Sequence, residues 1–208
     1  MKNIYLIFCG ALFCLLFSFS GIVVSNYFQC GSLEPIALED GAPKYPGHPL
    51  GMAEQGKQVY ISQGCAYCHS QQTRPKGFGA DIERGWANRQ SVARDYIYQN
   101  RVLLGTMRTG PDLVDVGTRL STADWHHLHL YDPRLTSPGS TMPAFEYLYK
   151  KQKINGSPSP KALRFPPNYP HRPETGFEIV PTERAEQLVS YLLHLKLDYE
   201  LPESKFVD

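Results

Sequence analysis

The sequence has little excess of charge of either sign, and this balance excludes one broad class of function. Its 208 residues contain 21 lysines and arginines against 20 aspartates and glutamates, a formal net charge of +1. No basic patch or stripe stands out, and a protein that binds nucleic acid needs one. We therefore expect no nucleic-acid partner.

Cysteine is scarce and odd in number, so the five cysteines cannot all be joined in disulfides within the chain. Cys9 and Cys14 lie inside an apolar run and are most simply small packing residues. Cys30 follows that run, and we interpret it as an unreactive single thiol. The residues before it, Tyr27-Phe28-Gln29, are not the small residues that a lipid-modification signal requires. The remaining two cysteines form a motif.

Cys65-Ala66-Tyr67-Cys68-His69 has the spacing of a covalent haem c attachment site. On one turn of chain the two thiols can reach the two vinyl groups on one edge of a porphyrin and form thioethers. His69 is then carried beneath the iron as its proximal ligand. The sequence therefore predicts one haem c, held by Cys65 and Cys68.

Two other interpretations of the cysteine pair fit less well. A thioredoxin-like dithiol needs a βαβ context, and no strand-rich unit surrounds the motif. A zinc site needs further ligands, and the only candidates are His126, His127 and His129. No carboxylate or cysteine is spaced to complete a metal shell with them, so we expect these histidines to be surface residues or to support the haem site.

The sixth iron ligand has three candidates: Met107, His129 and Met142. Met107 precedes Gly110-Pro111, a predicted turn. In haem proteins of this kind the carbonyl of such a turn typically meets the imidazole of the proximal ligand, so Met107 belongs on the proximal side. Nothing in the sequence fixes the His129 ring toward iron. Met142 lies in a loop that Pro143 holds extended, and thioether ligation raises the potential of haem iron. We predict His69 and Met142 as the axial ligands.

The N-terminal segment is long and apolar enough to cross a membrane. Residues 4–24 contain no charged side chain, and about 20 apolar residues span the ~30 Å hydrocarbon core. A cleaved signal peptide is the alternative, but no small-residue cleavage site follows. Positive charge precedes the segment and Glu34, Glu39 and Asp40 follow it, which favours a cytoplasmic N-terminus. The haem domain would then be periplasmic.

These patterns divide the chain into an anchor (1–31), a Pro-rich linker (32–51), a haem domain (52–200) and a polar, loose tail (201–208). Proline should hold the linker extended. The haem domain is interrupted by a Pro-rich insertion at about 150–181, whose part from 157 onward we expect to be irregular. Helices are predicted at 53–63, 91–103, 122–131 and 181–197. The last should cross the first at Gly56, where glycine allows close approach.

Residues 50–148 resemble the membrane-anchored monohaem subunit, subunit II, of cbb3-type cytochrome c oxidase. The resemblance rests on Gly56-Lys57-Gln58-Val59-Tyr60, Gly64-Cys65, Cys68-His69-Ser70-Gln71, Arg74-Pro75, Arg108-Thr109-Gly110-Pro111-Asp112-Leu113, Val116-Gly117, Arg119, Asp124-Trp125-His126, His129-Leu130, Asp132-Pro133-Arg134 and Met142-Pro143-Ala144. Gln72-Thr73 stands where the family usually has two apolar residues, and the insertion from Lys150 onward is unfamiliar.

The resemblance implies an all-α, class I cytochrome c-like haem domain behind a single transmembrane helix in a bacterial inner membrane. Such a subunit is not itself the catalyst. It takes electrons from another cytochrome c subunit or a soluble cytochrome c and passes them to a polytopic haem–copper subunit. The alternatives are the anchored monohaem subunit of a nitric oxide reductase, a free-standing anchored carrier, and a haem enzyme or gas sensor with an open sixth site.

Overall fold

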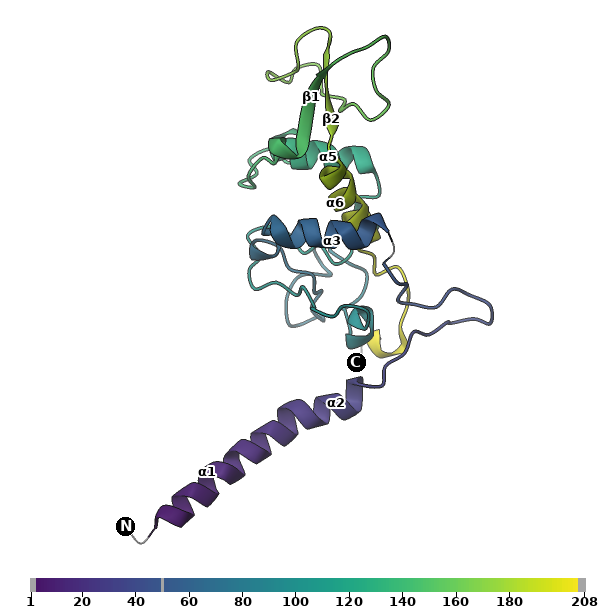
Figure 1. Ribbon diagram of the computed structural model, residues 1–208. Helices are drawn as coiled ribbons and strands as arrows, with labels where there is room; N and C mark the ends of the chain where they lie inside the picture. The colour runs from purple at the N-terminus through teal and green to yellow at the C-terminus, as the bar shows by residue number, and fades with distance from the viewer. Residues whose placement is uncertain (1–2, 50, 206–208) are drawn as a thin grey trace. The chain divides into compact units, whose positions relative to one another are not determined.

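The computed structural model describes residues 3–49 and 51–205 (Figure 1). Its first element is one continuous helix of 27 residues, Ile4–Cys30, apolar enough to cross a membrane. It comprises α1 (Ile4–Phe19), a π-helical turn (Ser20–Val24) and α2 (Ser25–Cys30). Its apolar side chains are exposed along its length, as a lipid-facing helix requires.

The chain forms two compact units, and the first contains residues up to 47 together with 92–100. The prolines predicted an extended linker, but the linker is not simply extended. Ile36 and Tyr45 exchange two backbone hydrogen bonds, of 2.9 and 2.8 Å, so the chain folds back on itself. The Tyr45 hydroxyl then donates to the carboxylate of Asp95 at 2.7 Å, which ties the linker to residues 92–100.

The prediction of a helix at 91–103 is wrong. Only a 3-10 turn, Ala93–Tyr96, is present there. The Asp95 carboxylate accepts the backbone N–H of Val92 at 2.8 Å, which closes this short turn locally. Further on, in the second unit, the carbonyl of Leu104 accepts the N–H of Gln71 at 2.9 Å and Leu103 is buried. These contacts with distant parts of the chain replace a continuing helix.

The second unit contains residues 48–91 and 101–205, apart from the undescribed position 50. Its elements are α3 (Met52–Ser62), η2 (Cys65–Tyr67), α4 (Val116–Arg119), α5 (Ala123–Tyr131), η4 (Pro133–Leu135), η5 (Glu146–Leu148), β1 (Tyr149–Lys153), β2 (Phe177–Pro181), α6 (Glu183–His194) and η6 (Pro202–Ser204). The helices predicted at 53–63 and 122–131 are present to within one residue. The last predicted helix is also present, and it ends three residues early.

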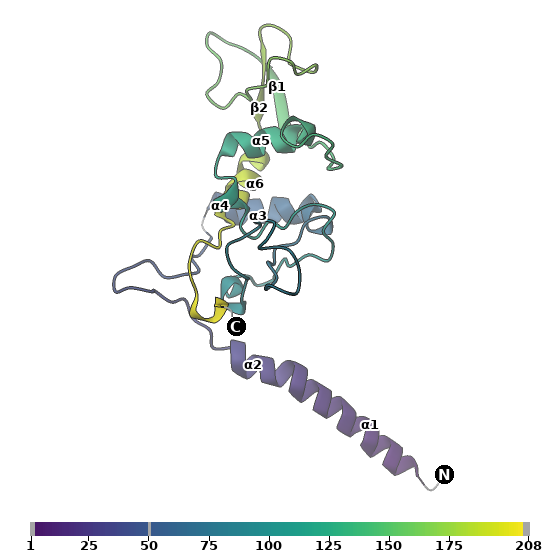
Figure 2. The same ribbon diagram turned by 180° about the vertical axis from the view of Figure 1, so that it is seen from behind.

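The centre of this unit is the crossing of α3 and α6, which lie against each other in Figures 1 and 2. A Cβ atom on Gly56 would lie 1.9 Å from the carbonyl oxygen of Gln187, so only glycine permits this approach. Next to the crossing, the Tyr60 and Tyr191 rings meet edge to face, with centroids 5.4 Å apart. The predicted role of Gly56 in the helix crossing is confirmed.

Helix α6 begins at Glu183, two residues after the start of the predicted range. Thr182 accepts the N–H of Ala185 at its hydroxyl oxygen, a standard N-cap contact. Beyond the helix, the Leu197 N–H donates to the Asp115 carboxylate at 2.7 Å, and Leu201 and Ser204 are buried. The described part of the tail is therefore packed rather than loose.

The prediction of an all-α domain is wrong in the insertion, which contains two strands. The unit is rich in helix, but β1 and β2 pair antiparallel, with Tyr149 opposite Pro181 and Lys153 opposite Phe177. The irregular stretch expected to reach 181 thus ends in a strand. In Figures 1 and 2 the strands and the loop between them project beyond α5, on the side away from α3.

Candidate functional site

The CxxCH segment follows directly from the end of α3. Gly64 has a φ of +73°, a left-handed conformation that ends the helix and that glycine adopts without strain. The chain then makes the 3-10 turn Cys65–Tyr67, and the His69 N–H donates to the Cys65 carbonyl at 3.0 Å. Two thiols and an imidazole are thereby placed on a single tight turn.

The His69 ring is fixed from the side by the Gly110-Pro111 segment. Its Nδ1 lies 2.8 Å from the carbonyl oxygen of Pro111, and because a carbonyl only accepts, Nδ1 carries the proton. The expected contact is therefore present, and Nε2 is left unprotonated, the form of the nitrogen that can bind a metal. A Cβ atom on Gly110 would lie 2.3 Å from Cε1 of the same ring, so glycine is needed there.

Burial lowers the pKa of His69, although the Pro111 carbonyl and the Asp112 charge act in the opposite direction. The neutral imidazole is thus favoured, which is the form that binds a metal.

One cavity of about 430 Å³ gathers the residues that the motif singled out. This volume lies in the range of roughly 300–1,000 Å³ typical of small-molecule and cofactor sites. Cys65, Cys68, His69, Pro111 and Met142 all line it. The rest of its lining is largely apolar and includes Leu113, Val116, Leu120, Leu130, Leu188 and Leu192.

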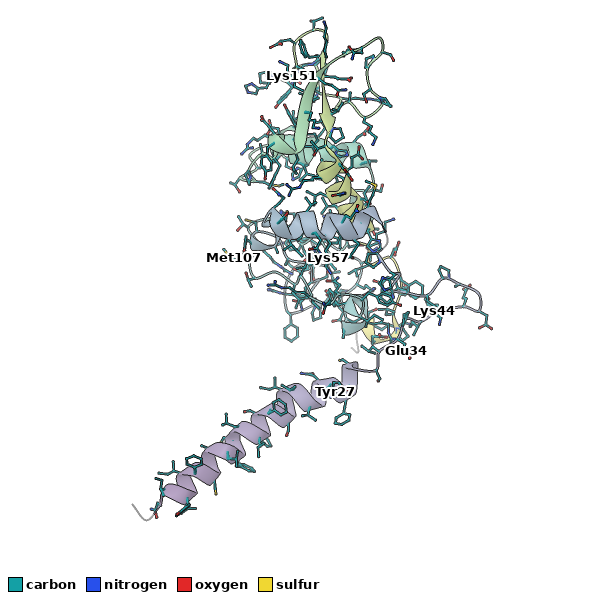
Figure 3. The ribbon with its side chains drawn as sticks, viewed as in Figure 1. Tyr27, Glu34, Lys44, Lys57, Met107 and Lys151 are labelled. Atoms are coloured by element: carbon teal, nitrogen blue, oxygen red, sulfur yellow. The ribbon has the colours of Figure 1, made fainter. Side chains whose placement is uncertain are left out.

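Of the other candidate ligands, Met107 does not line this cavity. Its side chain is 58% exposed and lies at the outer edge of the unit (Figure 3). His129 does line the cavity. Its ring stacks on Trp125, with centroids 4.7 Å apart, and its Nδ1 lies 2.6 Å from the Thr136 hydroxyl. The structure therefore fixes the His129 ring, which the sequence did not indicate.

The three histidines of α5 have separate partners. His126 Nε2 donates to the Leu120 carbonyl at 2.8 Å, and His127 Nδ1 lies 3.2 Å from the Tyr149 hydroxyl. Both are buried rather than on the surface. Within residues 3–49 and 51–205, no group of three or more His, Cys, Asp or Glu side chains could hold a metal ion.

The cavity has the chemistry that a haem needs. Arg119 lines it, and the Nε of Arg119 is buried with no hydrogen-bond partner among the described residues. Burial lowers the pKa of this guanidinium, against the opposing charges of Asp115 and Asp112. A buried donor of this kind calls for an anionic acceptor, and a haem propionate is one. Sequence reasoning gave Arg119 no role of its own.

The Cys65 thiol has properties that disfavour dithiol redox chemistry. Burial raises its pKa to about 12. The attacking cysteines of thiol–disulfide enzymes have lowered pKa values, because the thiolate is the nucleophile. The thioredoxin-like alternative is thus opposed by the electrostatics of the site as well as by the absence of a βαβ unit around it in the described chain.

A helical unit with an apolar, CxxCH-lined cavity is typical of monohaem electron-transfer proteins. A model of the family described as cytochrome c oxidase, mono-heme subunit/FixO, matches residues 38–164, more than half of the chain. The protein belongs to this family, the monohaem subunits of cbb3-type oxidases. The match ends inside the insertion, before β2 and α6. A search of the curated proteins finds no match.

Proposed function

We propose that this subunit carries one haem c, bound through thioethers from Cys65 and Cys68, with His69 and Met142 as axial ligands. It would relay electrons from another cytochrome c subunit, or a soluble cytochrome c, to the polytopic haem–copper subunit. The observation that carries the proposal is the single cavity lined by all four residues. Haem iron, when bound, supplies a one-electron couple between its ferric and ferrous states.

Each residue has a separate task. The S–H groups of Cys65 and Cys68 would add across the two vinyl C=C bonds, which leaves no by-product. The Pro111 carbonyl holds the proton on His69 Nδ1 and so presents Nε2. Met142 is half-buried against the hydrophobic core, and its backbone N–H donates to the Ser140 hydroxyl at 3.2 Å, which holds the loop. A thioether ligand on the second face would keep oxygen from binding there.

The apolar lining would keep water from the cofactor, which raises the reduction potential by disfavouring the more charged ferric state. Arg119 would bind a propionate at its unpartnered Nε. With Ile4–Cys30 as a single transmembrane helix, an N-terminus in the cytoplasm would place this domain in the periplasm of a bacterial inner membrane, facing the electron donor.

The ligand assignment is tested by spectroscopy of the full-length protein in detergent. The wild type should show the weak charge-transfer band, at the red end of the visible spectrum, that sulfur bound to ferric iron produces. Met142→His should keep covalent haem, lose this band and have a lower potential, because imidazole favours ferrous iron less than a thioether does.

Met107→Ala is the matched control, since this methionine is exposed and outside the cavity, and it should keep the band. His129→Ala should keep it as well. If Met142→Ala retains the band, the wrong ligand was chosen. The same conclusion follows if the wild type lacks the band and its spectrum changes in His129→Ala.

A further inference from the structure

Residues 68–72 and 108–114 are joined along their length. The Gly110 N–H donates to the Cys68 carbonyl at 2.9 Å, and the Leu113 N–H donates to the Ser70 carbonyl at 2.8 Å. These bonds flank the contact between His69 and Pro111. The position of the imidazole therefore depends on how these two segments are held together.

The Asp112 carboxylate is the strongest link between them. The residue is fully buried, at 0% exposure. One carboxylate oxygen accepts from the Ser70 hydroxyl at 2.5 Å and from the Gln72 N–H at 2.8 Å, and the other accepts from the Val114 N–H at 2.8 Å. Since Asp112 directly follows Pro111, these bonds also fix the carbonyl that faces His69.

Arg108 extends the network with a positive charge. Its Nε donates to the Ser70 hydroxyl oxygen at 2.8 Å, and its Nη2 donates to the Gln72 carbonyl at 2.6 Å and lies 3.5 Å from Asp112. Its Nη1 donates to the buried Asp81 carboxylate at 2.5 Å. The guanidinium also lies over the ring of Trp86, 5.3 Å from its centroid.

We propose that Asp112 and Arg108 are positioning residues: they orient His69 through the Pro111 carbonyl, and their opposite charges set the reduction potential of the haem. This inference rests on the proposed function. Asp112 is fully buried and Arg108 is 18% exposed, and charges in a low-dielectric interior act strongly on their neighbours. The Asp112 charge lies next to Pro111, whose carbonyl oxygen is 2.8 Å from Nδ1 of His69.

The two charges should act with opposite sign. The Asp112 carboxylate favours the more positive ferric state and lowers the potential. The Arg108 guanidinium favours the ferrous state and raises it. A merely structural role would behave differently. If each residue only held the loop in place, replacing either one would loosen the same loop and move the potential in the same direction.

The experiment is a redox titration of the full-length protein with its haem, in detergent. Asp112→Asn should raise the midpoint potential and Arg108→Gln should lower it. Each should change the ratio of oxidised to reduced protein on the order of tenfold, which is about 59 mV for one electron. Arg108→Lys keeps the charge and should restore most of the wild-type potential.

Arg84→Gln is the matched control. Arg84 also lies over the Trp86 ring, 5.1 Å from its centroid, but it is exposed and should shift the ratio much less. Shifts of the same sign in Asp112→Asn and Arg108→Gln, no shift in either, or an equal shift in Arg84→Gln would each overturn the inference.

Asn at position 112 must turn an N–H toward a backbone donor, so the yield of Asp112→Asn with haem is measured first. If this variant does not accumulate, Asp81→Asn replaces it: removal of this second carboxylate should raise the potential, and a fall or no change would refute the charge mechanism. Covalent haem is measured separately, by haem staining after denaturation. A wild type without covalent haem refutes the proposed function, whereas normal haem with unshifted potentials refutes only this inference.

Discussion

Replacement of Gly110 by alanine should disturb the His69 ring more than any other single methyl group in the site. The added Cβ would lie 2.3, 2.7 and 2.9 Å from Cε1, Nδ1 and Nε2 of the imidazole. Carbon atoms in contact are normally about 3.5–4.0 Å apart. The ring or the Gly110-Pro111 segment must therefore move by more than about 1 Å, and the 2.8 Å contact between His69 and Pro111 cannot survive such a movement.

Two costs contribute. Overpacking a tightly packed site costs roughly 1–3 kcal/mol, and the lost hydrogen bond costs about 0.5–1.5 kcal/mol. Gly110→Ala should thus lower the free energy of unfolding of the haem-containing protein by about 1.5–4.5 kcal/mol. Guanidinium unfolding, followed by far-UV circular dichroism and by haem absorbance, measures this change. The fraction of protein with covalent haem should also fall, because His69 is displaced beside the two cysteines that we propose attach it.

Gly79→Ala is the matched control. A Cβ atom there would have its nearest neighbour, the Arg74 side chain, at 3.4 Å, and the unfolding free energy should change by less than about 0.5 kcal/mol, as for ordinary surface substitutions. If Gly110→Ala unfolds like the wild type and has the same haem spectrum, then the Gly110 contact does not hold His69.

Four further outcomes are expected. Gly56→Ala should lower the free energy of unfolding by about 1–3 kcal/mol or more, measured in guanidinium, because its Cβ would collide with the backbone of Gln187; an unchanged value would contradict the tight crossing. Burial, with the nearby charges of His69 and His126, lowers the pKa of His129 to about 4. Its neutral form therefore stabilises the fold above about pH 6.5, the unfolded value, and this contribution is lost as the pH falls toward 4. Thermal melts of His129→Gln should show that stability falls less steeply between these pH values than in the wild type. An equally steep fall would exclude His129 as the source of the pH dependence. N-terminal sequencing of the mature protein should find residues 4–24 retained, whereas a start between 25 and 31 would indicate a cleaved signal. Mild detergent extraction from the native membrane should yield the subunit together with a large haem-containing partner, and a subunit that migrates alone would favour a free-standing carrier.

Several exposed aromatic side chains agree with the expectation of a partner. Tyr67 and Tyr147 are 76% and 65% exposed, and Phe78 is 80% exposed. Large exposed apolar groups commonly mark interaction surfaces.

Local patterns in the sequence determined the elements that depend on nearby residues. The CxxCH motif, the apolar N-terminal helix and the amphipathic helices α3 and α6 each follow from spacing over a few turns. The crossing at Gly56 could also be predicted, since a glycine on an apolar helix face has few other uses. The Pro111 contact with His69 came from the turn chemistry of Gly110-Pro111 and from the family resemblance.

Tertiary contacts decided the rest. The segment 91–103 remains largely non-helical. Asp95 closes a local turn with Val92 and accepts a hydrogen bond from Tyr45, far away in the chain. Leu104, which follows the segment, accepts one from Gln71. The linker folds back through Ile36 and Tyr45, and the insertion closes as a two-stranded sheet whose partners lie 24 or more residues apart. Such pairings carry no local signal, because each strand becomes stable only when its partner is in place.

The same reason applies to the site. The sequence identifies Cys65, Cys68 and His69 as a unit because they are adjacent, whereas its prediction of Met142 as the sixth ligand is a choice among residues that are distant in the chain. Only the folded chain brings Met142 and Arg119 to the cavity and leaves Met107 outside it. The carboxylate of Asp112 and the guanidinium of Arg108 are ordinary charges in the sequence. The fold buries Asp112, places Arg108 beside it and sets both next to the segment that holds His69, and burial is a property of the tertiary structure.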